Sequence, residues 1–463
     1  MTATNERAAR GTAAGAPLAP DAIAERVLEV VRGKAADVEA EVLIRTGRSA
    51  LTRFANSFVH QNVAEDVSAV RLRVALDGRV AASGLEGSIG GEALARLVDD
   101  TLEAARVRPV DPDWPGLAPA VPAPGVEHWD EATAIASPTE RARHVRAFVD
   151  GADGLETAGF CSTDGFEVAF ANSAGQRLGG RGSVAIQQGI ARTSTSDGGV
   201  RLADVSLAAL DSGSLGRVAG EKARTSAAPT DLEPGRYPVI LEPAAVVDLL
   251  HFLFIYGFNG RSVEEGRSFA RVGEAQFDPA ISIREDVTDP GQIGVPFDAE
   301  GTPKRPVDIV GRGVTEAILH TRRTAAKAGT TSTGSAVPGG DDFGALPENI
   351  VVDAGDRSFE ELLAGMDRGL LVTEFHYTRI LDPRTTVVTG LTRNGVWLIE
   401  NGRIARPVKN LRFTQSYHEA LAPGAVLGVG RDRSLVPAEW ELGASLVPAL
   451  HLASWNFTGG ARG

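Results

Sequence analysis

The C-terminal part of the chain reads LLVTEFHYTRILDPRTTVVTGLTRNGVWLIENGRIARPVK from Leu370 to Lys409. It divides into four short runs rich in β-branched and aromatic residues, separated by turn-forming residues. The dipeptides Asn394-Gly395 and Asn401-Gly402 predict hairpin turns, because both residue types tolerate a positive φ. We therefore predict an antiparallel meander in this stretch, set within a β-rich C-terminal domain.

The N-terminal half alternates between helical and strand patterns. Apolar residues recur at helical spacing over Asp21–Lys34 and Gly91–Val107, with Asp21 as the candidate N-cap of the first helix. The run from Val70 to Val74 alternates apolar and polar residues, which indicates a half-buried strand that ends at an Asp77-Gly78 hairpin turn. Glycines punctuate 157–191 and predict short strands there.

Together these patterns predict an α+β protein of two domains. We expect a flexible Ala/Gly-rich tail over 1–20 and an N-terminal α+β domain, a mixed sheet with helices, over 21–225. A proline-containing stretch over 226–235 is the predicted boundary. The β-rich domain then spans 236–463.

Composition excludes several classes of function. The chain has 463 residues, and Lys+Arg 47 against Asp+Glu 60 gives a net charge of −13, which argues against a nucleic-acid partner. Cys161 is the only cysteine, so neither an intrachain disulfide nor a thiolate metal cluster can form. The first 20 residues lack the apolar core of a signal peptide, and charged residues and a proline interrupt the most apolar run, Tyr237–Phe258. We expect a cytoplasmic protein without a membrane partner.

The helix predicted after Pro243 carries a solitary histidine in the sequence LLHFLFIYGFNGRS, Leu249–Ser262. Zinc peptidases place two histidines and a glutamate close together on one helix, so that the imidazoles hold the metal and the carboxylate deprotonates its water. His251 has no glutamate, second histidine or cysteine within reach. Phe252 cannot accept a proton, and Tyr256 is a poor zinc ligand because its ordinary pKa is about 10. These residues predict no metal site, and a lone histidine of this kind is more often structural.

Four further stretches resemble the TldD/PmbA (TldE) family. FANSFVHQNVAEDVSAVRLRVALDGRVAAS, 54–83, is similar to the family's opening sheet, and 266–314, from GRSFARVGEAQFDP to VGRGV, is similar to its most recognisable block. AAKAGTTSTGSA, 325–336, and the stretch 375–413 resemble its C-terminal sheet. The order and number of these stretches make the resemblance strong, and they cover most of the chain.

The resemblance implies a particular role. The TldD type carries a His-Glu-x-x-x-His helix and a C-terminal cysteine that together bind zinc. Laid onto this chain, these positions fall on His251, Phe252 and Tyr256, and no cysteine follows Cys161. The departure matches the PmbA/TldE type, a metal-free partner of TldD. The resemblance therefore implies a heteromeric peptidase that degrades unfolded or leader-type peptides, with zinc in the TldD-like subunit and no cofactor in this chain.

Four residues of the predicted meander are candidates for substrate binding: Glu374, His376, Tyr377 and Arg379. Glu374 and His376 lie two apart on a strand and share a face, so they can act as a base and its orienter, although a surface ion pair is the commoner reading. Arg379 can clamp a peptide carboxylate. Exposed strands can also accept an extended peptide through main-chain hydrogen bonds.

Two other functions fit the same residues. The chain can be a stand-alone module that binds a peptide or small amide without cutting it. It can also be a specialised amide hydrolase in small-molecule biosynthesis, for which the sequence identifies no nucleophile. Ser332–Ser335 is not such a site, because the G-x-S-x-G elbow is absent.

Overall fold

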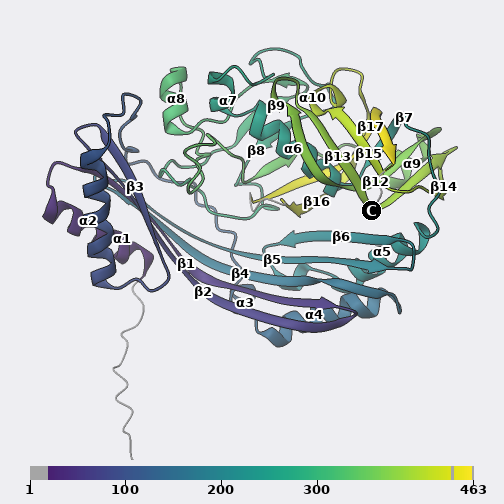
Figure 1. Cartoon of the computed structure of the whole chain (residues 1–463), viewed down its shortest axis with the longest axis horizontal. Helices are drawn as coiled ribbons and strands as arrows, with labels where there is room; N and C mark the ends of the chain where they lie inside the picture. Colours follow the sequence, from purple (N-terminus) through teal and green to yellow (C-terminus); the bar gives the residue numbers. More distant parts are fainter. Residues whose placement is uncertain (1–18, 439–442, 461–463) are drawn as a thin grey trace, which may run out of the picture.

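Two β-sheets form the framework of the computed structural model, which describes residues 19–438 and 443–460. The first is six-stranded, with the order β3-β2-β1-β4-β5-β6. In Figure 1 its long curved strands run beneath the C-terminal half of the chain. Its strands are β1 (Glu39–Ala55), β2 (Phe58–Leu76), β3 (Arg79–Glu86), β4 (Glu156–Asn172), β5 (Arg177–Arg192) and β6 (Asp197–Asp204).

Helices cover the outer part of this sheet at both ends. In one group, α1 (Pro20–Lys34) packs on β1 and β4, and α2 (Gly91–Val107) packs on β2 and β3. In the other group, α3 (Glu131–Ala134) packs on β4 and β5, α4 (Pro138–Gly151) on β1 and β4, and α5 (Ser212–Thr225) on β5 and β6, with the short turn η1 (Leu207–Ala209) before α5. Each group buries its own apolar cluster against the strands. This arrangement confirms the α+β prediction, although the six strands all run antiparallel and the mixed sheet lies in the C-terminal half.

The sequence predicts short strands separated by glycines over 157–191, but β4 and β5 continue through their glycines. The two strands have 17 and 16 residues. A Cβ on Gly165 would lie 2.4 Å from the Cβ of Ala134 in α3, and one on Gly189 would lie 2.5 Å from the ring of Phe148 in α4. The glycines therefore let helices approach the backbone of long strands closely.

Two helices of the N-terminal half begin with different caps. At α4, Ser137 and Glu140 form a capping box. At α1 the predicted cap was wrong: Ala19 is the N-cap residue, and Pro20 is the first helical residue. Proline suits that position because its missing N–H has no helical partner there. Asp21 lies in the first turn, and residues 1–18 of the predicted tail lie outside the described residues.

The C-terminal sheet is eleven-stranded and mixed. Five of its strands pair in a closed ring, in the order β7-β12-β13-β15-β17. The ring closes because β7 pairs in parallel with β12 and antiparallel with β17. The strands are β7 (Gly235–Leu241), β8 (Ile283–Glu285), β9 (Val307–Gly311), β10 (Val314–Thr315), β11 (Ile350–Val352), β12 (Arg368–Asp382), β13 (Val387–Glu400), β14 (Arg403–Pro407), β15 (Leu411–Ser416), β16 (Val426–Pro437) and β17 (Ala444–Gly460).

Short helical segments connect these strands. They are α6 (Pro243–Phe252), the π-helical turn η2 (Leu253–Gly257), α7 (Gly260–Glu264), α8 (Arg322–Ala328), α9 (Phe359–Ala364), η3 (Pro383–Thr385) and α10 (Tyr417–Ala420). α6 packs on β12 and β17, inside the largest apolar cluster. No helix among the described residues is long and apolar enough to cross a bilayer.

Two of the three predicted hairpin turns are confirmed. Asp77-Gly78 joins β2 to β3, and Asn401-Gly402 joins β13 to β14, each with positive φ at both residues. Asn394-Gly395 was wrongly predicted as a turn and lies inside β13. Both of its residues keep a positive φ, 58° and 125°, opposite a register shift in β12. The dipeptide therefore forms an irregularity within a strand rather than a chain reversal.

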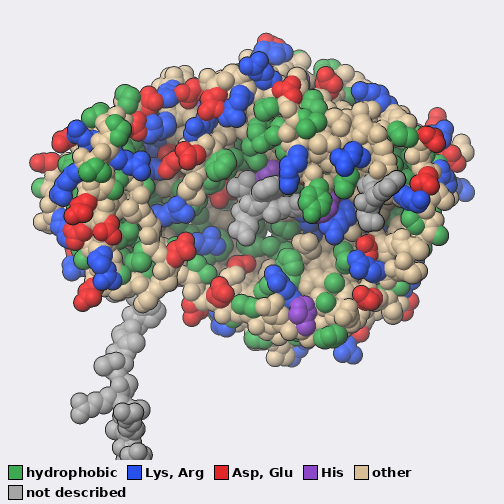
Figure 2. Space-filling model, viewed as in Figure 1, with side chains coloured by type: hydrophobic (Ala, Val, Ile, Leu, Met, Phe, Trp, Pro, Cys, Tyr) green, Lys and Arg blue, Asp and Glu red, His purple; other side chains and the backbone are tan. Residues whose placement is uncertain are grey.

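The two halves meet where β6 lies against β13 and β16. A shared apolar cluster contains Ala203 of β6 together with Leu435 and Leu446. A Cβ on Gly199 of β6 would lie 2.5 Å from the amide nitrogen of Asn394. Figure 2 shows acidic and basic side chains interspersed over one face of the molecule, with a recess between the halves.

Candidate functional site

The helix that the resemblance compares with a zinc site is filled by aromatic rings. α6 begins at Pro243 and continues into the π-helical turn η2, which places Phe252 and Tyr256 one above the other. Their rings stack with centroids 6.1 Å apart and planes 15° apart. The ring of Tyr417 lies nearly perpendicular to that of Phe252, with centroids 5.8 Å apart and planes 83° apart, and Phe252 is only 6% exposed. Phe252 is therefore part of the packed core, and the partly buried Tyr256 packs against it.

His251 is buried beside this stack, with its ring 6.0 Å from that of Phe252. Burial lowers the pKa of His251 to about 4, so its imidazole is neutral at physiological pH. Zinc sites need three or four protein ligands. Over 19–438 and 443–460, no three His, Cys, Asp or Glu side chains are placed to hold a metal ion together. The residues around His251 do not fit zinc.

One turn before His251, Asp248 ties α6 to two other elements. Its Oδ1 accepts a hydrogen bond from the hydroxyl of Thr378 on β12 at 2.8 Å, and its Oδ2 accepts one from the hydroxyl of Tyr417 at 2.8 Å. Burial and the neighbouring Asp248 carboxylate raise the pKa of Tyr417 well above its ordinary value, so the phenol keeps its proton and remains a donor. The helix and β12 are therefore held in one relative position.

β12 is irregular at the residues predicted to bind substrate. Its pairing with β13 shifts register between Val372 and Glu374 and again between His376 and Arg379. Within the second irregularity Tyr377 has a φ of 52° and is 66% exposed. A positive φ is rare for a bulky residue and costs about 1–3 kcal/mol. Strain of this kind often marks a binding surface.

The candidate side chains are positioned by β13. Glu374 accepts a hydrogen bond from the amide of Asn394, and Nε2 of His376 lies 3.0 Å from a guanidinium nitrogen of Arg393. The rings of His376 and Tyr377 contact each other at 4.4 Å. Arg379 donates to the carbonyl of the preceding residue at 2.8 Å. The four candidates therefore lie on one irregular strand segment that presents an aromatic ring, an imidazole and a guanidinium.

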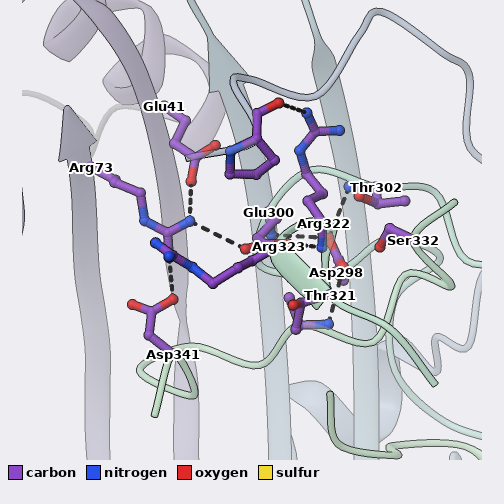
Figure 3. A network of polar contacts seen from close by, with 12 residues as sticks. Glu41, Arg73, Asp298, Glu300, Thr302, Thr321, Arg322, Arg323, Ser332 and Asp341 are labelled. Carbon is purple, nitrogen blue, oxygen red and sulfur yellow. Dashed lines mark hydrogen bonds and ion pairs between the residues drawn. The ribbon is translucent and has the colours of Figure 1, made fainter. Parts of the chain in front are cut away.

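A second polar site, which the sequence analysis missed, lies between the N-terminal sheet and the segment 298–344. Arg73 of β2 donates to Glu41 of β1 at 2.8 Å, to Glu300 at 3.4 Å and to Asp341 at 2.7 Å. Figure 3 shows the Arg73 guanidinium between these carboxylates. Burial raises the pKa of Glu41 to about 8, because the nearby Arg73 offsets only part of the desolvation.

Neighbouring groups fix the carboxylates of this network. Oδ1 of Asp298 accepts the backbone N–H groups of Glu300 and Thr302 at 2.9 and 2.8 Å, and burial together with Glu300 raises the pKa of Asp298. Glu300 also accepts the N–H of Arg322 at 2.9 Å, and the Arg322 side chain donates to the carbonyl of Leu117 at 2.6 Å. The sequence signal was the Asp-x-x-Gly turn beginning at Asp298, inside the block 266–314.

The sequence of this chain is similar to that of known proteins. Residues 234–459 match the PmbA/TldA metallopeptidase C-terminal domain. A metalloprotease from Methanothermobacter thermautotrophicus is 26% identical over 221 residues, which cover 47% of this chain and 48% of that protein. A Synechocystis metalloprotease is 25% identical over 192 residues, 40% of this chain and 41% of its own length. The chain thus spans about half the length, or less, of these curated relatives.

Solved structures share the fold over nearly the whole chain. TldE from Thermococcus kodakarensis superposes with a TM-score of 0.83 at 18% identity, covering 94% of this chain and 100% of that one. A Thermotoga maritima crystal structure assigned as a modulator of a DNA gyrase gives 0.82 at 20% identity, with the same coverage. At these identities the likeness concerns the fold, while the sequence matches concern the C-terminal half. The sequence match therefore places residues 234–459 in the TldD/PmbA family, and the solved structures show the same fold over nearly the whole chain.

Proposed function

We propose that this chain is the metal-free subunit of a two-component zinc peptidase that acts on unfolded or leader-type peptides. The observation that carries the proposal is the ring stack of Phe252 and Tyr256 at the positions where the family's zinc type has a glutamate and a histidine. The partner in this proposal is a TldD-like subunit that supplies zinc. This chain supplies part of the wall that holds the peptide.

The irregular segment of β12 is the proposed peptide-contacting surface. An exposed tyrosine ring can stack on side chains of many kinds, and guanidinium groups such as Arg379 and Arg393 can donate to peptide carbonyls and carboxylates. Because Asp248 and β13 hold this segment in place, it offers a preformed surface and loses little freedom on binding. Recognition of this kind depends weakly on peptide sequence.

Purification of the chain alone and with a zinc-bearing homologue tests the proposal. The chain alone, supplied with zinc and an unstructured polypeptide such as casein, is expected to leave that polypeptide intact. Co-expressed with a TldD-like homologue, it is expected to co-elute in size-exclusion chromatography, with zinc bound to the pair and cleavage that a chelator stops. Chelator-sensitive cleavage by the chain alone would overturn the proposal, as would the absence of any complex.

A matched pair of variants tests the peptide surface in the assembled pair. Tyr377 and Phe343 are both exposed aromatic residues, 66% and 65%, but Phe343 lies on a different loop. Tyr377→Ala is expected to raise the KM for peptide several-fold with little change in kcat, because it removes contact rather than chemistry. Phe343→Ala is expected to leave both constants unchanged. Equal effects of the two substitutions would remove β12 from the proposal.

A further inference from the structure

A small cavity lies between strands β1 and β2 and the loop 336–344. We call it the β1–β2 pocket, and its volume is about 190 Å³. Its lining combines charged residues with apolar side chains that include Leu43, Phe170 and Val337. Leu43 and Phe170 are directly opposite each other on the antiparallel strands β1 and β4. They give the pocket an apolar surface next to its charged groups.

The β1–β2 pocket is lined by three carboxyl groups and three guanidinium groups, those of Glu41, Glu300, Asp341, Arg71, Arg73 and Arg323. A single guanidinium, that of Arg73, serves the three carboxylates of Glu41, Glu300 and Asp341. Glu41 is only 4% exposed, and its second oxygen accepts no hydrogen bond from a described residue. Both oxygens of Glu300 accept hydrogen bonds. An ammonium group inside the pocket can bond the second oxygen of Glu41 by displacing the proton that burial otherwise keeps on this carboxyl group.

The guanidinium of Arg71 lies at the rim of the β1–β2 pocket. Arg71 lies two residues from Arg73 on β2, so both point to the same face of the sheet. Arg71 is exposed and forms no hydrogen bond or ion pair with a described residue. Its guanidinium nitrogen would lie 3.1 Å from a Cβ on Gly339, which places it over the loop that borders the pocket.

We propose that the β1–β2 pocket binds a free amino acid with an aliphatic side chain. The ammonium group bonds the open oxygen of Glu41, the carboxylate bonds Arg71, and the side chain packs on Leu43 and Phe170. The volume suits such a ligand, because cavities of about 150 Å³ take up benzene. The ligand would contact both the N-terminal sheet and the loop 336–344, and so would hold the two halves together.

Calorimetric titration of the full chain with three related probes tests this assignment. The probes are L-leucine, 3-methylbutylamine, which lacks only the carboxylate, and 4-methylpentanoate, which lacks only the ammonium group. L-leucine is expected to bind about tenfold or more tightly than either analogue, because each charged group adds a charge-assisted hydrogen bond. The titration uses the chain by itself, so its outcome is independent of the proposed peptidase partnership.

Variants assign each end of the ligand. Arg71→Ala is expected to reduce L-leucine affinity to that of the amine, and Glu41→Gln to reduce it to that of the acid. Arg53→Ala, an exposed arginine elsewhere on the same sheet, is the matched control and is expected to change nothing. Far-ultraviolet circular dichroism verifies that each variant is folded. Failure of L-leucine to bind, equal binding of all three probes, or binding unaffected by both pocket substitutions would overturn the proposal.

Discussion

Replacing Phe252 by glutamate introduces a carboxyl group at the position where zinc peptidases of the family have one, but it should destabilise the protein. Phe252 is 6% exposed and packs against the rings of Tyr256 and Tyr417. Burial of a phenylalanine contributes about 1.5–3 kcal/mol, and each aromatic pair adds about 0.5–1.5 kcal/mol. A carboxyl group placed there also loses its hydration. Phe252→Glu should therefore lower the free energy of unfolding by about 3–5 kcal/mol.

Urea titration followed by tryptophan fluorescence measures this loss, since the ring of Trp455 lies 5.4 Å from that of Tyr417, which contacts Phe252. Phe252→Leu is the control, because it keeps an apolar side chain and should cost about 1–1.5 kcal/mol. Unfolding of Phe252→Glu at the same urea concentration as the native chain would contradict this expectation. Phe252 would then border an open site rather than fill a core.

Three further predictions concern the other contacts. Burial raises the pKa of Glu41 to about 8 from an ordinary 4.5, so between these pH values the folded chain keeps a proton that the unfolded chain loses. The stability that Glu41 contributes is therefore full below pH 4.5 and declines up to about pH 8. Glu41→Gln should remove that part of the decline in urea titrations at different pH values. Tyr417→Phe deprives Asp248 of a donor and should cost about 1–3 kcal/mol in the same assay, whereas no loss would mean that water replaces the phenol. At position 377, where φ is 52°, Tyr377→Gly should be more stable than Tyr377→Ala by about 1 kcal/mol in thermal unfolding, and the reverse order would contradict the strain.

The Asn-Gly dipeptides correctly predict positive φ angles, but they do not by themselves predict whether the chain reverses. Asn394-Gly395 and Asn401-Gly402 are the same dipeptide, and both adopt positive φ. Only the second reverses the chain. Asn394 is held inside β13 because its amide bonds Glu374 on β12 and lies against Gly199 of β6. A contact between residues far apart in sequence decided the outcome, and no short window of sequence contains it.

The two candidate sites differ in how far sequence could reveal them. The lack of a glutamate or a second histidine close to His251 is visible within one helix. Tyr417, whose ring lies perpendicular to that of Phe252, follows much later in the chain, so the sequence alone could not assign it to this cluster. In the second site Arg73 reaches partners 32, 227 and 268 residues away, at Glu41, Glu300 and Asp341. Their pairing depends on the packing of the N-terminal sheet against the C-terminal half, which no spacing rule describes.

The aromatic rings packed around α6 are connected to the strained segment of β12 by a chain of contacts. Phe252 meets the ring of Tyr417, the hydroxyl of Tyr417 bonds Asp248, and the other oxygen of Asp248 bonds Thr378, the residue after Tyr377. A backbone conformation that costs about 1–3 kcal/mol persists only when its surroundings fix it. The rings of Phe252 and Tyr417 therefore support the surface proposed to hold peptide. We expect Phe252→Leu to weaken peptide binding by the assembled pair although Phe252 is buried, and Phe343→Ala to leave it unchanged.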